Sequence, residues 1–317
     1  MGNGMEMSGA ALTTNQIEFA EHLATIWQPS GTAGNSSAFV HCYPITRSRY
    51  WKPWRARFAT PVHHWWCRSL EEAAGNYSWP DPSPTLTFAV IAARLRDAIA
   101  QDNDEQAREA SLDLFRWGGV GRRPDDNSRI WIEREAAMGT LCQSVKRAVE
   151  LLQPSSSGSL RPFDGATFPM NAAMTKVYAA ADPDNLIIYD GRVGAALGLL
   201  ARYWLERRGD RAVPPDLAFR WGVGRSKTVR DPSSTGYRFT SLYSPSTSLL
   251  HRDAAWAAMV RKGSQILKRA VSATAFTATV GEFERALFMI GYDVGSEAGL
   301  PDPLPAVTEV QGLLAED

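Results

Sequence analysis

The sequence is poor in cysteine, has no net charge and contains no long apolar run. Its 317 residues include three cysteines, Cys42, Cys67 and Cys142. This small, odd number argues against a disulfide framework and favours a reducing compartment. No stretch reaches about 18 uninterrupted apolar residues, and residues 1–15 lack the basic and apolar segments of a signal peptide. We therefore expect a cytoplasmic protein without a membrane partner.

Charge is balanced overall but unevenly distributed. Lysine plus arginine and aspartate plus glutamate number 34 each, so the net charge gives no argument for a nucleic-acid partner. From His22 to Leu70, however, there are six basic residues and no acidic one, whereas the residues after Arg285 include six acidic and no basic ones. A DNA-binding surface would have to be local, and residues 22–70 are its best source.

Apolar residues recur mainly at helical spacing and alternating strand patterns are rare, so the sequence predicts a mainly α fold. The expected helices cover residues 15–27, 85–100, 105–115, 129–152, 169–181, 191–207, 251–274 and 280–292. The composition of residues 154–167, P-S-S-S-G-S-L-R-P-F-D-G-A-T, is typical of a linker or surface loop. We therefore expect a disordered lead-in at 1–14 and two helical lobes, at 15–153 and 168–317.

Residues 47–58, R-S-R-Y-W-K-P-W-R-A-R-F, mix basic side chains with aromatic rings. In nucleic-acid-binding segments, guanidinium groups contact phosphates and rings stack on unstacked bases. The segment therefore predicts a DNA-binding surface, with a ring filling the space that an extruded base leaves. The alternative is that the rings belong to the core of the first lobe. The candidate DNA contacts are Arg47, Arg49, Trp51, Trp54 and Arg55.

A glycine-rich motif occurs twice, as F-R-W-G-G-V-G-R at 115–122 and as F-R-W-G-V-G-R at 219–225. Neither copy has the spacing of a P-loop or of a dinucleotide-binding motif, and no cofactor is predicted. The two copies are either similar helix ends or loops whose backbone N–H groups bind phosphate. In the second interpretation, Arg225 and Lys227 add positive charge for DNA.

Residues 168–200 predict a helix, a turn, a short extended run and a second helix. The first helix stops near Pro183, because proline lacks an N–H and restricts the residue before it. Lys176 lies about 7.5 Å back along that helix, and four extended residues return roughly 13 Å. Asp190, 14 residues after Lys176, therefore comes back alongside it, as the N-cap of the second helix. Arg192 follows as a further candidate phosphate contact.

A paired lysine and aspartate can act on a sugar. Free N–H groups and the helix dipole keep an N-cap carboxylate ionised, and such a charge stabilises an oxocarbenium-like cation. A neutral lysine amine can attack the same carbon, which burial favours and a nearby Asp190 opposes. That conflict stays open at this point. The plainer alternative is that Asp190 is only a structural cap and Lys176 a solvated helix residue.

The order helix, lysine, apolar run, aspartate, helix resembles the catalytic half of helix-hairpin-helix DNA glycosylases, in particular the bacterial 8-oxoguanine-glycosylase-like family. The matching pieces are K-V-Y-A-A-A from Lys176, I-I-Y-D-G-R-V around Asp190 and E-F-E-R-A-L-F-M-I-G at 282–291, and the resemblance covers about half of the chain. The family's hairpin reads L-P-G-V-G before the lysine, whereas residues 169–175 contain no glycine. The resemblance implies that Lys176 attacks the sugar of a flipped nucleotide and that Asp190 assists.

The resemblance further implies cleavage of the N-glycosidic bond of a modified base, with 8-oxoguanine and the glucosylated hydroxymethylcytosine of phage DNA as the substrates, in base-excision repair or phage defence. A Schiff-base lysine would also allow strand cleavage. A non-catalytic DNA-binding protein and a metal-dependent nuclease are the alternatives. His41, Cys42, His63, His64 and Cys67 lack the spacing of a zinc site, so no metal is predicted. We expect a monomer.

Overall fold

Helices make up most of the regular structure of the protein. The computed structural model describes residues 11–28, 39–79, 81, 83, 86–224, 228–244, 249–296 and 299–306. Within these ranges the α-helices are α1 (Thr14–Thr25), α2 (Lys52–Arg55), α3 (Leu70–Gly75), α4 (Phe88–Ala100), α5 (Asp104–Gly118), α6 (Asn127–Ala137), α7 (Leu141–Leu152), α8 (Met174–Ala181), α9 (Gly191–Arg208), α10 (Leu249–Ala273) and α11 (Val280–Ile290). The mainly α class predicted from the sequence is confirmed.

One predicted helix is wrong. Residues 129–152 form two helices, α6 and α7, instead of a single one. Gly139 between them adopts a φ of +67°, a left-handed conformation that ends a helix and that glycine adopts without steric cost. The amphipathic pattern continued across this break, which is why the sequence alone suggested one helix.

The strands are short. β1 (His41–Pro44) pairs antiparallel with β2 (His64–Cys67), with His41 opposite Cys67, and β3 (Arg220–Trp221) runs parallel to β4 (Thr240–Ser241). The basic-aromatic segment at residues 47–58 lies in the connection between β1 and β2. The pairing of these strands therefore constrains the orientation of the segment.

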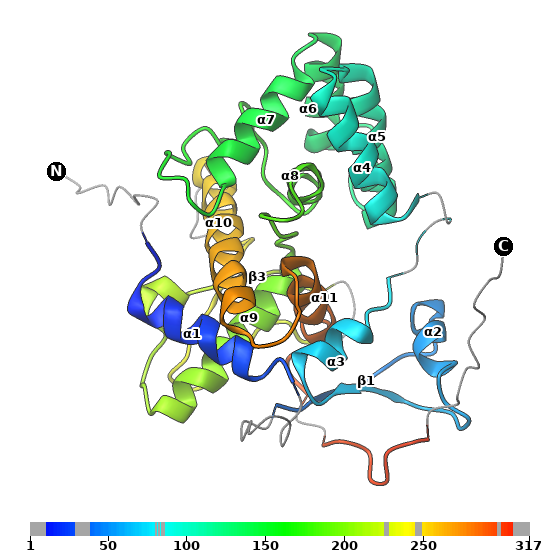
Figure 1. The fold of residues 1–317 in the computed structure, drawn as a ribbon, viewed down its shortest axis with the longest axis vertical. Helices are drawn as coiled ribbons and strands as arrows, with labels where there is room; N and C mark the ends of the chain where they lie inside the picture. Colours follow the sequence, from blue (N-terminus) through cyan, green and yellow to red (C-terminus); the bar gives the residue numbers. More distant parts are fainter. Residues whose placement is uncertain are drawn as a thin grey trace.

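Figure 1 shows helices α4 to α7 at one end of the molecule and α1, α3, α9 and α11 toward the other, with α8 between the two groups. Helix α1 packs against α10, α3 against α11, and α4 against both α5 and α8. Contacts thus join segments from both halves of the chain, and the domain boundaries expected from the sequence stay a prediction. None of the helices in the described ranges has the length and hydropathy that a membrane span needs.

Side chains hold the backbone at the start of α8, in a segment without glycine. The Oδ1 atom of Asn171 accepts hydrogen bonds from the backbone N–H groups of Ala173 (2.9 Å) and Met174 (3.2 Å). The carboxylate of Asp253, on α10, accepts a third from the N–H of Met170 at 2.7 Å. These side chains satisfy backbone N–H groups just before and at the start of α8, which fixes the orientation of the helix.

Candidate active site

Lys176 and Asp190 lie on two helices that a buried extended run joins. Residues 186–189 are all buried, as the sequence predicted. The hydroxyl of Thr175 accepts a hydrogen bond from the N–H of Tyr189 at 2.9 Å. Lys176 and Asp190 are the next residues along the chain from these two partners, so the bond brings their backbones near each other. Within the described residues their side chains form no ion pair, because the Lys176 amine bonds to the carbonyl of Ala172 and Asp190 to the start of α9.

Side chains from other helices satisfy the backbone of the run. On α10, Ser264 Oγ accepts from the N–H of Ile187 at 3.2 Å, and Trp256 Nε1 donates to the carbonyl of Tyr189 at 2.7 Å. On α11, Glu284 Oε2 accepts from the N–H of Ile188 at 2.7 Å. Because buried backbone groups need partners, these bonds hold the run, and Asp190 at its end, in one position.

Asp190 is the N-cap of α9, as predicted. Its Oδ1 accepts hydrogen bonds from the N–H groups of Arg192 (2.8 Å) and Val193 (3.1 Å). Within the described residues, its second oxygen makes no hydrogen bond, and the side chain is only partly buried. Asp190 is therefore held in position by its Oδ1 atom and has one carboxyl oxygen available.

Lys176 is buried, which contradicts its interpretation as a solvated helix residue. Its side chain is 6% exposed, and its Nζ donates to the carbonyl of Ala172 at 2.7 Å. Burial lowers the pKa of Lys176, with Arg192 acting in the same direction and with Asp190 and Glu284 opposing. The net direction of the pKa is downward, so the effect of burial outweighs the opposing effect of the two carboxyl groups.

Gly118 makes room for the lysine side chain. A Cβ atom at residue 118, the last of α5, would lie 2.4 Å from Cε and 2.6 Å from Cδ of Lys176. Any residue larger than glycine would therefore displace the aliphatic part of the lysine. This glycine belongs to the first copy of the repeated motif, in which Gly119, with a φ of +64°, ends α5.

Glu284 is the ionisable residue that the sequence analysis missed. It lies on α11, and burial raises its pKa to about 8, with Asp190 adding to the rise and the Ile188 hydrogen bond, Lys176 and Arg285 opposing it. One signal could have found it. Glu284 lies four residues from both Val280 and Phe288, and a carboxylate on the same helix face as two apolar residues indicates a special environment.

Aromatic rings surround Arg192, the second residue of α9. Its guanidinium carbon lies 4.4 Å from the ring centroid of Phe288, 5.0 Å from that of Tyr292, 5.6 Å from that of Tyr50 and 5.7 Å from that of Trp79. Its Nη1 donates to the Tyr50 hydroxyl at 3.4 Å. We call these four rings the ring cluster. Cation–π attraction holds the guanidinium there, and the predicted phosphate contact of Arg192 stays a prediction.

Three glycines bring backbone segments together at the N-terminus of α9. A Cβ at Gly194 would lie 2.0 Å from the carbonyl oxygen of Arg220, and one at Gly291 would lie 1.9 Å from that of Arg192. In the second copy of the motif, Gly222 donates from its N–H to the carbonyl of Gly191 at 3.2 Å. This copy forms β3 and a close backbone contact, and it does not end a helix as the first copy does.

The basic-aromatic segment is placed differently from the expected DNA-binding surface. Trp51 is 0% and Trp54 3% exposed, so the interpretation of these rings as stacking on DNA bases is wrong, and they belong to the core. Arg55 donates to the carbonyls of Thr46 (2.7 Å), Ser48 (3.1 Å) and Arg47 (3.2 Å), which gives it a role in holding the loop.

Of the other predicted DNA contacts, two lie within the described residues and two lie outside them. Arg47 is exposed and remains a candidate phosphate contact. Arg49 is the first residue of a 3₁₀ turn, Arg49–Trp51. Arg225 and Lys227 lie outside the described residues. The phosphate-binding interpretation of that loop therefore stays a prediction.

The histidines and cysteines of the β1–β2 pair have structural partners. His41 Nε2 lies 2.8 Å from the carbonyl oxygen of Asp293 and 3.1 Å from that of Ile290. Burial lowers the pKa of His41 to about 4, so the ring is neutral and Nε2 is the donor. Cys42 and Cys67 are buried free thiols. Across the described ranges, no three His, Cys, Asp or Glu side chains come together as a metal site.

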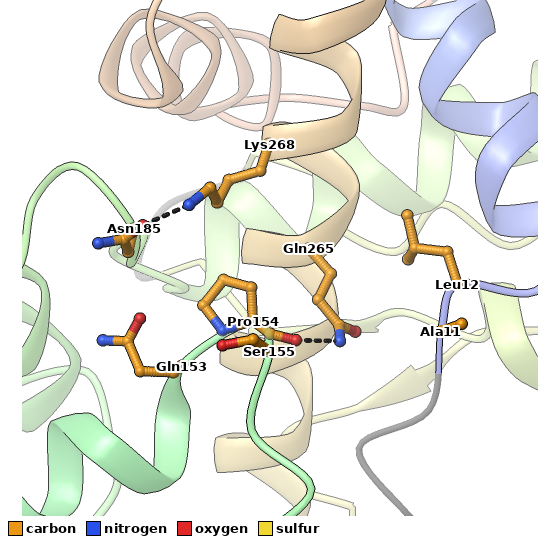
Figure 2. A pocket seen from close by; sticks show the side chains of 8 residues that line it. All are labelled: Ala11, Leu12, Gln153, Pro154, Ser155, Asn185, Gln265 and Lys268. Atoms are coloured by element: carbon orange, nitrogen blue, oxygen red, sulfur yellow. Dashed lines mark hydrogen bonds between the residues drawn. The ribbon is translucent and has the colours of Figure 1, made fainter.

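Two surface cavities lie away from Lys176 and Asp190. The larger, of about 480 Å³, is lined by Ala11, Leu12, Gln153, Pro154, Ser155, Asn185, Gln265 and Lys268. Figure 2 shows Lys268 bonded to Asn185 and Gln265 bonded to the carbonyl of Pro154 across its floor. The smaller, of about 380 Å³, includes Arg47 and Arg55. Neither cavity brings together groups for a reaction, and the lysine–aspartate pair remains the candidate site.

The arrangement around Lys176 suits nucleophilic chemistry. A buried amine with a lowered pKa, a fixed carboxylate and a second carboxyl group with a raised pKa lie on α8, α9 and α11. Such a set can attack a carbon centre, stabilise a cation and move a proton. Family models, curated proteins and solved structures all give no match to this chain, so its function has to be argued from this site.

Proposed function

We propose that this protein is a DNA glycosylase of the helix-hairpin-helix type, with Lys176 as its nucleophile and Asp190 as its assisting carboxylate. The observation that carries the proposal is the pairing of a buried lysine, whose pKa burial lowers, with a helix-capping aspartate that has one available oxygen. The helix, run and helix that position the pair are in the order that the resemblance implies. The two-lobed form of that fold is part of the proposal.

The reaction follows from these two groups. As the bond between the sugar C1′ and the base nitrogen breaks, its electron pair leaves with the base and positive charge develops on the sugar. The Asp190 carboxylate stabilises that charge. The lone pair of Lys176 Nζ forms the new C1′–N bond, and the attached nitrogen then loses a proton. Opening of the sugar ring gives an imine, from which strand cleavage can follow.

The resemblance indicates the class of substrate. Enzymes of this kind act on a base that is flipped out of the duplex. A modified base in DNA, either 8-oxoguanine or the glucosylated hydroxymethylcytosine of phage DNA, is therefore the proposed substrate, with base-excision repair or phage defence as the role. The ring cluster holds Arg192, two residues after Asp190, and so supports the start of α9.

The test is base release from two substrates, an 8-oxoguanine duplex and phage DNA with glucosylated hydroxymethylcytosine. We expect wild type to release base from one of them, and Asp190→Asn to be about 100- to 1000-fold slower. Asparagine is also a good N-cap, so this variant keeps the helix start. Borohydride should trap an imine with wild type but not with Lys176→Ala.

A matched control distinguishes a catalytic role of Asp190 from a general effect of removing one negative charge. Asp184 is exposed and lies just before the buried run, so Asp184→Asn removes the same charge without touching the site and should release base at the wild-type rate. DNA binding without base release from either substrate would instead favour the non-catalytic DNA-binding alternative.

A further inference from the structure

Two carboxyl groups with different hydrogen-bond partners act on Lys176. Asp190 accepts two backbone N–H bonds at the start of α9. Glu284, on α11, accepts only one, from Ile188. Two carboxyl groups in different surroundings divide the roles of base and acid in many enzymes.

One oxygen of Glu284 is available for a ligand. Oε2 accepts the Ile188 N–H at 2.7 Å, and within the described residues Oε1 makes no hydrogen bond and no ion pair. The carboxyl group is thus held at one oxygen and open at the other.

Glu284 also shares a helix face with the ring cluster. Phe288 lies one turn after it on α11 and Tyr292 continues the same face, and both rings contact the Arg192 guanidinium. The rings hold Arg192 at the start of α9, next to Asp190. Lys176, Asp190 and Glu284 therefore form one cluster of interacting groups from α8, α9 and α11.

The charged groups near Glu284 come from each neighbouring element. They are Lys176 on α8, Asp190 on α9 and Arg285 on α11, with the phenol of Tyr77 after α3. Burial and Asp190 favour the protonated form of Glu284, whereas Lys176 and Arg285 favour the ionised form. Because the pKa is raised to about 8, the group carries a proton at neutral pH.

We propose that Glu284 is the general acid that protonates the base as it leaves. This inference rests on the proposed glycosylase function. The electron pair of the broken C1′–N bond goes to the base, and the proton of Glu284 joins it, which leaves a Glu284 carboxylate. Attack by Lys176 produces a secondary ammonium ion, and its proton returns to Glu284. The cycle therefore needs no further reactant.

The first measurement needs no DNA. A difference infrared spectrum between wild type and Glu284→Gln reports the carbonyl stretch of a protonated carboxyl group. We expect this band at neutral pH and its loss as pH rises through about 8. Glutamine keeps an oxygen for the Ile188 N–H, so the variant should fold. Absence of the band at neutral pH would overturn the inference and leave the glycosylase proposal standing.

The second measurement is the pH profile of single-turnover base release. At neutral pH, Glu284→Gln should be about 100-fold slower than wild type. The wild-type rate should fall above about pH 8, where Glu284 loses its proton, whereas the glutamine variant should show no such fall. Glu284→Asp should restore part of the rate, and Glu109→Gln, an exposed residue of α5, should behave as wild type.

The outcomes separate the two proposals. Equal rates and equal profiles for wild type and Glu284→Gln would remove Glu284 from the reaction while the glycosylase stands. A wild-type protein that releases no base from either DNA overturns both proposals.

Discussion

The hydroxyl of Thr175 accepts the backbone N–H of Tyr189 in a buried hydrogen bond of 2.9 Å. Each partner directly precedes one member of the candidate pair, Lys176 and Asp190. A single side-chain-to-backbone bond therefore joins α8 to the extended run directly beside both residues. The hydroxyl that makes this bond carries no charge.

Replacing Thr175 by valine tests this bond. The side chains have nearly the same shape, but valine leaves the buried N–H of Tyr189 without its acceptor. We expect Thr175→Val to lower the free energy of unfolding by about 1–3 kcal/mol, measured by urea denaturation, and to slow base release. The exposed Thr60 provides the control, Thr60→Val, which should change neither quantity. Wild-type stability in Thr175→Val would refute the role given to the hydroxyl.

Gly118→Ala should displace the Lys176 amine, the proposed nucleophile, without unfolding the protein. The added Cβ meets the flexible end of the Lys176 side chain at 2.4 Å, so the lysine moves and the helices need not. Because a misplacement of about 1 Å can cost about 100-fold in rate, imine trapping should fall by that order while the melting temperature changes little. Gly281→Ala, where nothing lies within 4 Å of the added atom, is the matched control. Undiminished trapping in Gly118→Ala would contradict the placement of the amine.

Arg192 and Arg47 should differ in what they do for DNA binding. Arg47→Ala removes an exposed charge and should reduce the slope of log affinity against log salt by about 0.9. Arg192→Met removes a guanidinium held by rings, so we expect an unchanged slope and a loss of about 2 kcal/mol in the free energy of unfolding. Binding titrations over a range of salt concentrations measure both slopes. A reduced slope in Arg192→Met would assign that residue to a phosphate.

Stability should depend on pH through Glu284. Folding raises its pKa from 4.5 to about 8, so between these values the native state keeps a proton that the unfolded chain releases. The free energy of unfolding of the wild type therefore falls as pH rises through this window. Glu284→Gln lacks that contribution, and its stability relative to wild type should rise with pH and level off above about 8. A difference that stays constant with pH, in denaturant titrations, would show that Glu284 has an ordinary pKa.

Local patterns predicted the elements that carry Lys176 and Asp190. Helix spacing, Pro183 as a stop and an aspartate before Gly191 are all signals within one short stretch, and the structure confirms the buried run and the N-cap. Gly139, with its positive φ, is a further local signal, because glycine commonly ends a helix in this conformation.

Long-range contacts account for what the sequence did not predict. Glu284 meets the run 96 residues after Ile188, and the ring cluster draws Tyr50, Trp79 and two residues of the α11 region to Arg192. The burial of Trp51 and Trp54 depends on the β1–β2 pair, whose four-residue strands are too short to give a clear alternating pattern. The composition of residues 47–58 shows that the segment is unusual, but it does not show whether its rings are buried or exposed.

The close backbone contacts at Gly194 and Gly291 identify two positions near Asp190 that cannot accept a side chain. Any side chain at either position would collide with a carbonyl oxygen, at 2.0 Å and 1.9 Å, and a carbonyl cannot turn aside as a long side chain can. Directed evolution of this neighbourhood should therefore keep both glycines fixed. In a comprehensive mutational scan, they should be intolerant positions.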